Sequence, residues 1–318
     1  MHAPGLLVVT ALLAGGLVAG GSQALGIAYP RLRRAMGRLA PEGRARGLSL
    51  LAGLPWILAL GILFLAFLPS FITLPGLIED HCLPHDHHPH LCLRHGLWAP
   101  SGQAWGILAI LGAAGGAFWF RFLRRLVEGQ RQVRTLLRLA KKAGDFHLLP
   151  SRKALAFSAG LLRPRTLLSS VVMASLDGED LQVVLAHERA HARRRDALRL
   201  VVAEAMLMAV PRRVQGMLLE DLALACEEAC DRAAVPQAGG PERMAEVLLR
   251  VQRLGMAAPV GQLGATGSQL PLRVRALLGS PYPPAPAWPR ILWFSPLLIL
   301  LADPVHHAAE TLLGFLNP

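Results

Sequence analysis

Four long apolar runs constrain this chain more than any other feature. A helix needs about 20 apolar residues to cross a bilayer, and the first three runs reach that length. The mean hydropathy of +0.40, with 53% hydrophobic residues, is also too high for an ordinary soluble enzyme. We therefore predict a mainly α membrane protein with about four transmembrane helices. The runs are Gly5 to Tyr29, Leu48 to Leu77, Ala104 to Phe122 and the shorter Ile291 to Ala302.

The distribution of arginine predicts how these helices are oriented. Residues 30–47, between the first two runs, hold six arginines and one acidic residue, Glu42. Loops of this kind stay on the cytoplasmic side, so the amino terminus and the loop at 78–97 are expected to face outward. The net charge of +12 follows from this layout, and it favours contact with a lipid bilayer over direct binding of nucleic acid. The arginines are Arg31, Arg33, Arg34, Arg38, Arg44 and Arg46.

We expect a protein of a bacterial-type inner (plasma) membrane, and this orientation places its residues 124–288 on the cytoplasmic side. Residues 289–318 are then the fourth span and a short outward tail. Only residues 124–288 have ordinary polar content and enough length for a folded domain. Their patterns predict an α+β domain. The expected elements are a helix over Val127 to Lys142, short strands within Ala154 to Met173, a helix from Asp177 or Gly178, and helices over Leu200 to Val210, Val214 to Ala234 and Pro241 to Leu254, with a break at Pro236 to Gly240.

The helix that begins near Gly178 carries His187-Glu188-Arg189-Ala190-His191. Histidines four residues apart lie on the same helix face and can hold one zinc ion, and the glutamate between them can act as a general base on water. This pattern is typical of a zinc endopeptidase. His187 and His191 are thus predicted metal ligands, and Glu188 is the predicted catalytic base.

A catalytic zinc site needs a third protein ligand. Glu227 and Asp231 lie four residues apart on the next long helix, so Glu227 is the predicted ligand and Asp231 is expected to orient a ligand histidine. Glu228 is the alternative ligand, and Asp196 is a second candidate for orienting a histidine. Cys226 and Cys230 are expected to be structural thiols in the reducing cytoplasm.

Three segments resemble the BlaR/MecR-type membrane zinc metallopeptidases. They are "FSAGLLRPRTLL" from Phe157, "VVLAHERAHARRRD" from Val183 and "EEACDRAA" from Glu227; "LPLRVRALL" from Leu270 is similar to the closing helix of the family. The resemblance implies three spans, a cytoplasmic gluzincin domain and a fourth span, with His187, His191 and Glu227 as ligands and Glu188 as base. Relatives act as antirepressors that cleave, or trigger cleavage of, a cytoplasmic transcriptional repressor.

The resemblance leaves two roles to be assigned. Relatives usually have an oxyanion donor, for which Arg232 and Arg273 are the candidates here, and the stretch Ala156 to Leu162 is a candidate edge strand for an extended substrate. The beta-lactam sensors of the family continue into a penicillin-binding domain, whereas this sequence stops at Pro318. We therefore expect the peptidase half of the family plan without sensing by acylation.

The outward loop is rich in metal-binding side chains. These side chains favour binding of a transition metal such as zinc, copper or nickel. The alternatives are a flexible polar loop that binds metal only weakly and a loop closed by a disulfide between Cys82 and Cys92. A metal at this loop is a hypothetical switch for the peptidase. The candidate ligands are His81, Cys82, His85, His87, His88, His90, Cys92 and His95.

Two other functions fit the same sequence features. One is a membrane quality-control protease of the HtpX type, and the other is a metal-binding membrane receptor with an inactive peptidase site.

The fourth span has a longer alternative that runs to Leu316 and would bury four ionisable residues in the membrane. The shorter span is favoured and places His306 and His307 on the outward side. The four residues are Asp303, His306, His307 and Glu310.

Overall fold

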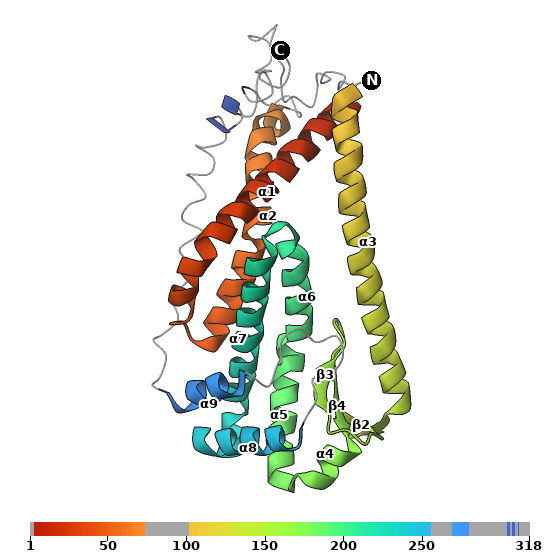
Figure 1. The fold of residues 1–318 in the computed structure, drawn as a ribbon, viewed down its shortest axis with the longest axis vertical. Coiled ribbons are helices and arrows are strands. Elements are labelled where there is room, and N and C mark those ends of the chain that lie inside the picture. Colours follow the sequence, from red (N-terminus) through yellow and green to blue (C-terminus); the bar gives the residue numbers. More distant parts are fainter. Residues whose placement is uncertain are drawn as a thin grey trace. The chain divides into compact units, whose positions relative to one another are not determined.

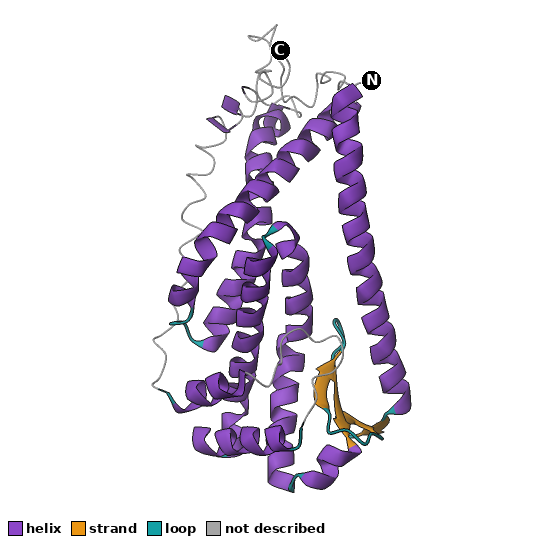
Figure 2. Ribbon diagram, viewed as in Figure 1, coloured by secondary structure: helices purple, strands orange, loops and turns teal. Residues whose placement is uncertain are grey.

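The computed structural model describes residues 3–73, 102–255 and 269–279, together with residues 304, 305, 307, 308 and 311. Most of these residues are helical (Figure 1; Figure 2). The chain divides into two compact units, of which the second contains Gly26–Gly53 and Phe120–Ala285. The predicted outward loop and the predicted fourth span lie outside the described residues.

Three long helices belong to both units. They are α1 (Ala3–Met36), α2 (Pro41–Thr73) and α3 (Gly102–Leu139). Among the described residues, the stretches Thr10–Met36 and Pro41–Leu68 are long and apolar enough to cross a membrane. The first predicted span thus lies within α1 and the third within α3, while the second lies in α2 as far as Thr73 and its last residues are outside the described part of the chain. A total of four spans stays a prediction.

The outer surface of α2 suits a lipid environment. Leu60 and Phe64 are 65% and 58% exposed in a helix whose sequence is almost wholly apolar after Gly47. A soluble protein would hide most of such a surface, whereas lipid tails solvate it without cost.

The predicted arginine-rich loop at 30–47 is mostly helical, so that prediction was wrong about local structure. Helix α1 continues through Pro30 to Met36, and α2 begins at Pro41. Pro30 removes one backbone hydrogen bond, but the fully buried Tyr29 anchors this turn through its hydroxyl, which donates to Asp221 Oδ2 at 2.7 Å. Pro41 suits the first position of a helix because its missing N–H would have no partner there.

A four-stranded sheet follows α3 in the second unit. Its order is β1-β2-β4-β3; β1 and β2 form an antiparallel hairpin, β2 runs parallel to β4, and β3 pairs antiparallel with β4 and forms an edge. The strands are β1 (Lys141–Ala143), β2 (Phe146–Leu149), β3 (Ala156–Ala159) and β4 (Arg165–Ser169).

The strands predicted within Ala154 to Met173 are confirmed as β3 and β4, but the β1–β2 hairpin was not predicted. The helix expected to reach Lys142 ends at Leu139. Gly144 adopts φ +66°, and the Gly144-Asp145 pair forms the tight turn of the hairpin. The residues before Gly144 have an amphipathic helical pattern, so a helix was predicted there and the turn was not recognised.

The remaining elements of the second unit are helical, and α5, α6 and α7 are prominent in Figure 1. Helix α7 passes through Pro236 and ends at Gly239, where φ is +84°, so the predicted break came a few residues early. A proline in the last turns removes only one hydrogen bond, and Gly239 supplies the left-handed residue that ends a helix. The helices are α4 (Ser170–Ser175), α5 (Gly178–Arg194), α6 (Asp196–Met206), the 3-10 turn η1 (Leu207–Ala209), α7 (Arg212–Ala238), α8 (Pro241–Arg253) and α9 (Leu270–Leu278).

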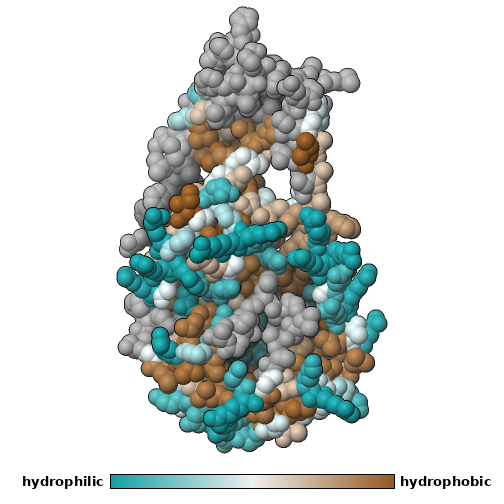
Figure 3. Space-filling view, in the orientation of Figure 1, coloured by the Kyte–Doolittle hydropathy of each residue, from teal (hydrophilic) through white to brown (hydrophobic). Residues whose placement is uncertain are grey.

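The two faces of the sheet pack against different helices. Leu167 is fully buried against residues of α3, including Val133 and Leu136, whereas Leu168 is fully buried in a cluster with Leu185 of α5 and Met244 of α8. Consecutive side chains of a strand point to opposite faces, so β4 joins both layers. Helix α5 is thereby fixed between the sheet and α7. Hydrophilic and hydrophobic residues are both exposed on the face of the protein shown in Figure 3.

Candidate metal centre

Helix α5 is fixed at its first turn. The Asp177 carboxylate caps the helix by accepting a hydrogen bond from the backbone N–H of Asp180 at 2.7 Å. Asp180 itself is buried and accepts hydrogen bonds from Arg243 Nη2 at 2.6 Å and Arg250 Nη1 at 2.8 Å. The start of α5 is therefore tied to α8 by charged hydrogen bonds.

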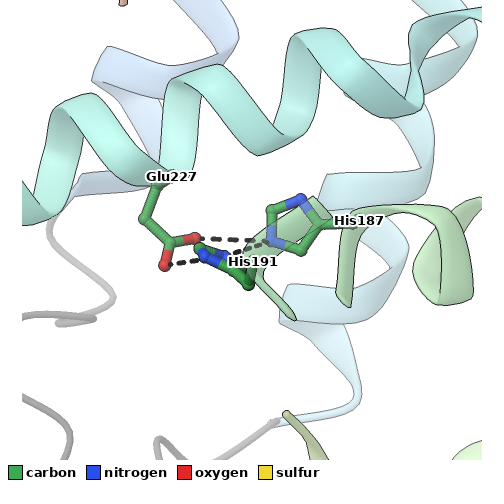
Figure 4. A group of neighbouring side chains, drawn as sticks. All are labelled: His187, His191 and Glu227. Carbon is green, nitrogen blue, oxygen red and sulfur yellow. Dashed lines mark hydrogen bonds and ion pairs between the residues drawn. The ribbon is translucent and has the colours of Figure 1, made fainter. Parts of the chain in front are cut away.

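Two turns further along α5, His187 and His191 point their Nε2 atoms at the same spot (Figure 4). These nitrogens are 3.1 Å apart. Glu227 reaches the same spot from α7, with its carboxylate oxygens 3.6 Å from His187 Nε2 and 3.4 Å from His191 Nε2. Helices α5 and α7 thus bring together the three residues that the sequence suggested as ligands.

The spacing of these donor atoms fits a small metal ion. Ligand atoms at 2.0–2.2 Å from a tetrahedral zinc are separated from one another by about 3.3 Å. The three observed separations lie around that value, and two of them are longer than good hydrogen bonds. Two imidazole nitrogens and one carboxylate oxygen are also a donor set that zinc accepts.

Each histidine has a carboxylate beside its other ring nitrogen. His187 Nδ1 lies 3.0 Å from Asp231 Oδ1, within ion-pair distance although not aligned as a hydrogen bond. His191 Nδ1 is hydrogen-bonded to Asp196 Oδ2 at 3.0 Å. Carboxylates in this position orient a ligand histidine and make it more basic, which leaves Nε2 free for a metal.

A left-handed residue explains how Asp196 comes back to the site. Arg195, between α5 and α6, has φ +52° and ψ +44° and is the only non-glycine residue with positive φ in the described part of the chain. This conformation costs about 1 kcal/mol for a residue with a Cβ atom. It reverses the chain sharply enough for the first residue of α6 to reach His191.

Arg273 of α9 joins the two carboxylates of α7. Its Nε and Nη2 donate to the two oxygens of Asp231 at 2.7 and 2.6 Å, and its Nη1 lies 3.0 Å from Glu227 Oε2. The guanidinium fork therefore holds both acidic side chains in place. With these donors engaged, Arg273 fits a clamp better than the oxyanion donor considered above.

The ionisation of the site follows from these contacts. Burial opposes the charged form of Glu227, but Arg273 and His191 outweigh it and hold the pKa of Glu227 well below its usual value. Burial also opposes protonation of His191, yet Glu227 and Asp196 raise its pKa well above the usual value. A carboxylate beside two basic imidazoles is an attractive place for a divalent cation.

Glu188 differs from the other acids of the site. Its side chain is buried, and burial raises the pKa of its carboxyl group. Within the described ranges, no hydrogen bond or ion pair engages this carboxylate. Its position on α5 next to His187 and its raised pKa suit a group that accepts and returns a proton.

Two other candidate residues, Glu228 and Arg232, form ion pairs with residues of α2. Glu228 forms an ion pair with Arg44 of α2, so the geometry favours Glu227 over Glu228 as the ligand. Arg232 lies 3.8 Å from Glu42 of α2.

The two cysteines of α7 are free and buried, as predicted. Burial raises the pKa of Cys226 to about 12 and that of Cys230 to about 11, so both are neutral thiols near pH 7. Cys230 forms a second potential metal-binding group with His191 and Asp196. However, Arg194 and Arg199 also contact Asp196, and their positive charges disfavour a second cation there.

Sequence reasoning missed the contacts between α7 and the segment that joins α1 to α2. Arg33 and Arg44 were interpreted only as signals of membrane orientation, and Asp221 was not considered. The spacing of Asp221 and Glu228, seven residues apart on the helix that holds Glu227, was the available signal.

A protein-family model described as BlaR1 peptidase M56 matches residues 72–277. The match includes α5, α6, α7 and all but the last residue of α9, and therefore all the residues named around the candidate metal centre. A search of curated proteins found no match. A search of solved structures found none either.

Proposed function

Because this chain belongs to the BlaR1 peptidase M56 family and is thus a metallopeptidase with a protein substrate, we propose that it is a zinc-dependent endopeptidase of the gluzincin type. The convergence of His187, His191 and Glu227 on one spot carries this proposal. His187 and His191 are the proposed nitrogen ligands and Glu227 the proposed oxygen ligand. Asp231, Asp196 and Arg273 hold them in position.

Zinc bound at this site would polarise a peptide carbonyl and make water more acidic. Glu188 is the residue that takes the proton from the attacking water and returns it to the leaving amine. Its burial keeps competing water away and raises its proton affinity. Arg273 keeps Glu227 ionised, and Asp196 keeps His191 oriented.

The edge strand β3 is the proposed binding place for an extended substrate. Among the described residues it pairs only with β4, on one side, and it packs beside α5, the helix that carries Glu188. An added strand would be recognised mainly through its backbone, so the side chains of the substrate would contribute less to selection.

The match to BlaR1 peptidases favours the signalling function over the HtpX-type alternative. We propose that the peptidase domain, residues 124–288, faces the cytoplasm of a four-span membrane protein and cleaves a transcriptional repressor. The arginines in the last turns of α1, in the first turns of α2 and between the two helices support this orientation. Comparing newly formed protein termini in cells expressing wild type or an inactive variant would test it; absence of any DNA-binding protein among the cleaved substrates would contradict it.

The proposed chemistry is tested by Glu188→Gln in the purified full chain. We expect zinc-dependent cleavage of an unfolded protein such as casein to fall by at least about 100-fold, because a general base contributes that much, while zinc affinity stays within a few-fold of wild type. Glu179→Gln is the matched control, since Glu179 lies exposed on the same helix. A wild-type cleavage rate in Glu188→Gln would contradict the role of Glu188 as the base, and a wild-type protein without zinc-dependent cleavage would favour a receptor with an inactive site.

A further inference from the structure

The segment that joins the first two membrane helices is part of the same compact unit as the metal centre. We call this segment, Gly26–Gly53, the elbow. Tyr29, Ala45 and Leu48 of the elbow are fully buried. The elbow is therefore packed into the unit that holds the metal centre, and its contacts bear on that centre.

The contacts of the elbow follow one stripe of α7. Asp221, Glu228 and Arg232 lie at positions i, i+7 and i+11, which share one face of a helix. Glu227 and Asp231 lie on a neighbouring stripe, and their side chains meet the two histidines. Helix α7 thus has one polar stripe for the metal centre and another for the elbow.

Three groups of charged contacts join this stripe to the elbow. Arg33 donates two hydrogen bonds to Asp221, at 2.6 and 2.8 Å, and Arg44 forms an ion pair with Glu228. Glu42 lies 3.8 Å from Arg232. The first turns of α2 therefore meet α7 through two pairs of opposite polarity.

Only one of these contacts is buried on both sides. The side chains of Arg44 and Glu228 are 11% and 5% exposed, whereas those of Glu42 and Arg232 are 40% and 41% exposed. Exposed pairs are screened by water and contribute little, but a buried pair has a strongly preferred geometry because either charge alone would be costly. The ion pair between Arg44 and Glu228 is thus the contact that can fix the rotation of α7.

We propose that Arg44 is a positioning residue for the metal centre: its ion pair with Glu228 fixes the rotation of α7 so that Glu227, the next residue, meets His187 and His191. This inference rests on the proposed zinc site. A rotation of α7 by about 10° would move a side-chain atom about 6 Å from the helix axis by about 1 Å. Misplacement by about 1 Å is enough to cost a site much of its function.

The position of Arg44 gives this contact a further consequence. Arg44 lies in the first turns of α2, whose residues Pro41–Leu68 form a candidate membrane span. If that span moves, Arg44 moves with it and displaces Glu228. The resulting rotation of α7 then changes the position of Glu227 in the proposed metal centre. Arg273 also holds Glu227 directly, so loss of the elbow contact is expected to weaken the site without abolishing it.

The test measures zinc affinity of the full chain in detergent by competition with a chelator. The double variant Arg44→Met with Glu228→Met removes both buried charges together and avoids leaving one unpaired. We expect its zinc Kd to rise by about 10-fold, while Arg44→Lys, which keeps the charge, stays within a few-fold of wild type. Glu42→Gln is the matched control in the same helix turn, and its Kd should not change.

A milder variant covers failure of the double variant to fold. Glu228→Asp keeps both charges and withdraws the carboxylate by one methylene, and we expect a rise of a few-fold in its zinc Kd. A wild-type Kd in a folded double variant, or in Glu228→Asp, would overturn the positioning role. A wild-type protein that binds no zinc at His187 and His191 would instead overturn the proposed function and, with it, the positioning role.

Discussion

At the scale of single residues, the proposed metal centre is an arrangement of charges in which each group is held by another. The histidines are oriented by Asp231 and Asp196, and the acids of α7 are held by Arg273. The sequence was sufficient to identify the ligand candidates, because the H-E-x-x-H spacing and the E-x-x-x-D spacing act within one helix. The role of Arg273 was not predictable, because it depends on how α9 packs against α7.

Asp196→Asn tests whether these outer contacts matter for metal binding. An amide oxygen beside His191 Nδ1 polarises the ring less than a carboxylate does, so we expect zinc affinity to fall by about 10- to 100-fold. The measurement is chelator competition on the purified protein, with Glu179→Gln as the control. An unchanged affinity would mean that Asp196 does not support a ligand histidine.

At the scale of elements, the site depends on helices α5, α6, α7 and α9 and on the left-handed turn at Arg195. Helix α5 was predicted well, because its Asp177 cap and its acidic first turn are local signals. The existence of α7 was predicted from its long pattern, but its end beyond Pro236 was not. The β1–β2 hairpin and the helical elbow were missed for a different reason. Short strands and helix ends next to proline are decided by packing partners, such as Asp221 for Tyr29, that lie far away in the sequence.

The left-handed turn at Arg195 allows a sharp test of the element that returns Asp196 to the site. We expect Arg195→Gly to be more stable than Arg195→Val by about 1–2 kcal/mol, because valine strongly disfavours positive φ. At Arg193, which is exposed in the last turn of α5, the order should reverse by roughly 0.4 kcal/mol or less, because glycine is less favourable than valine in a helix. Melting temperatures of the four variants provide the comparison; valine more stable than glycine at both positions would contradict the turn.

At the scale of the whole molecule, the proposed function joins an outward signal to a cytoplasmic cleavage. The family match establishes the peptidase, and the composition of α1 and α2 supports the membrane setting. The candidate outward metal site, from His81 to His95, lies outside the described residues, and its role as a switch stays a hypothesis. It was inferred from residue types alone, which indicate metal affinity but not specificity.

Metal titration tests this switch. Zinc, copper or nickel added to the outward side of membranes should change proteolysis by wild type but not by a variant whose loop histidines are replaced by serine. Proteolysis that is the same in both proteins, at every metal concentration, would exclude the loop as the sensor.

The central claim is that His187, His191 and Glu227 form a zinc site, and X-ray absorption at the zinc edge tests it most directly. The spectrum of the zinc-loaded full chain, after subtraction of that of the variant His187→Ala with His191→Ala, isolates this site from metal bound at the outward loop. We predict two imidazole nitrogens and a carboxylate oxygen at about 2.0–2.2 Å, with no sulfur. A sulfur ligand at about 2.3 Å, as expected if Cys230 bound the metal, or no difference between the two proteins, would contradict the account.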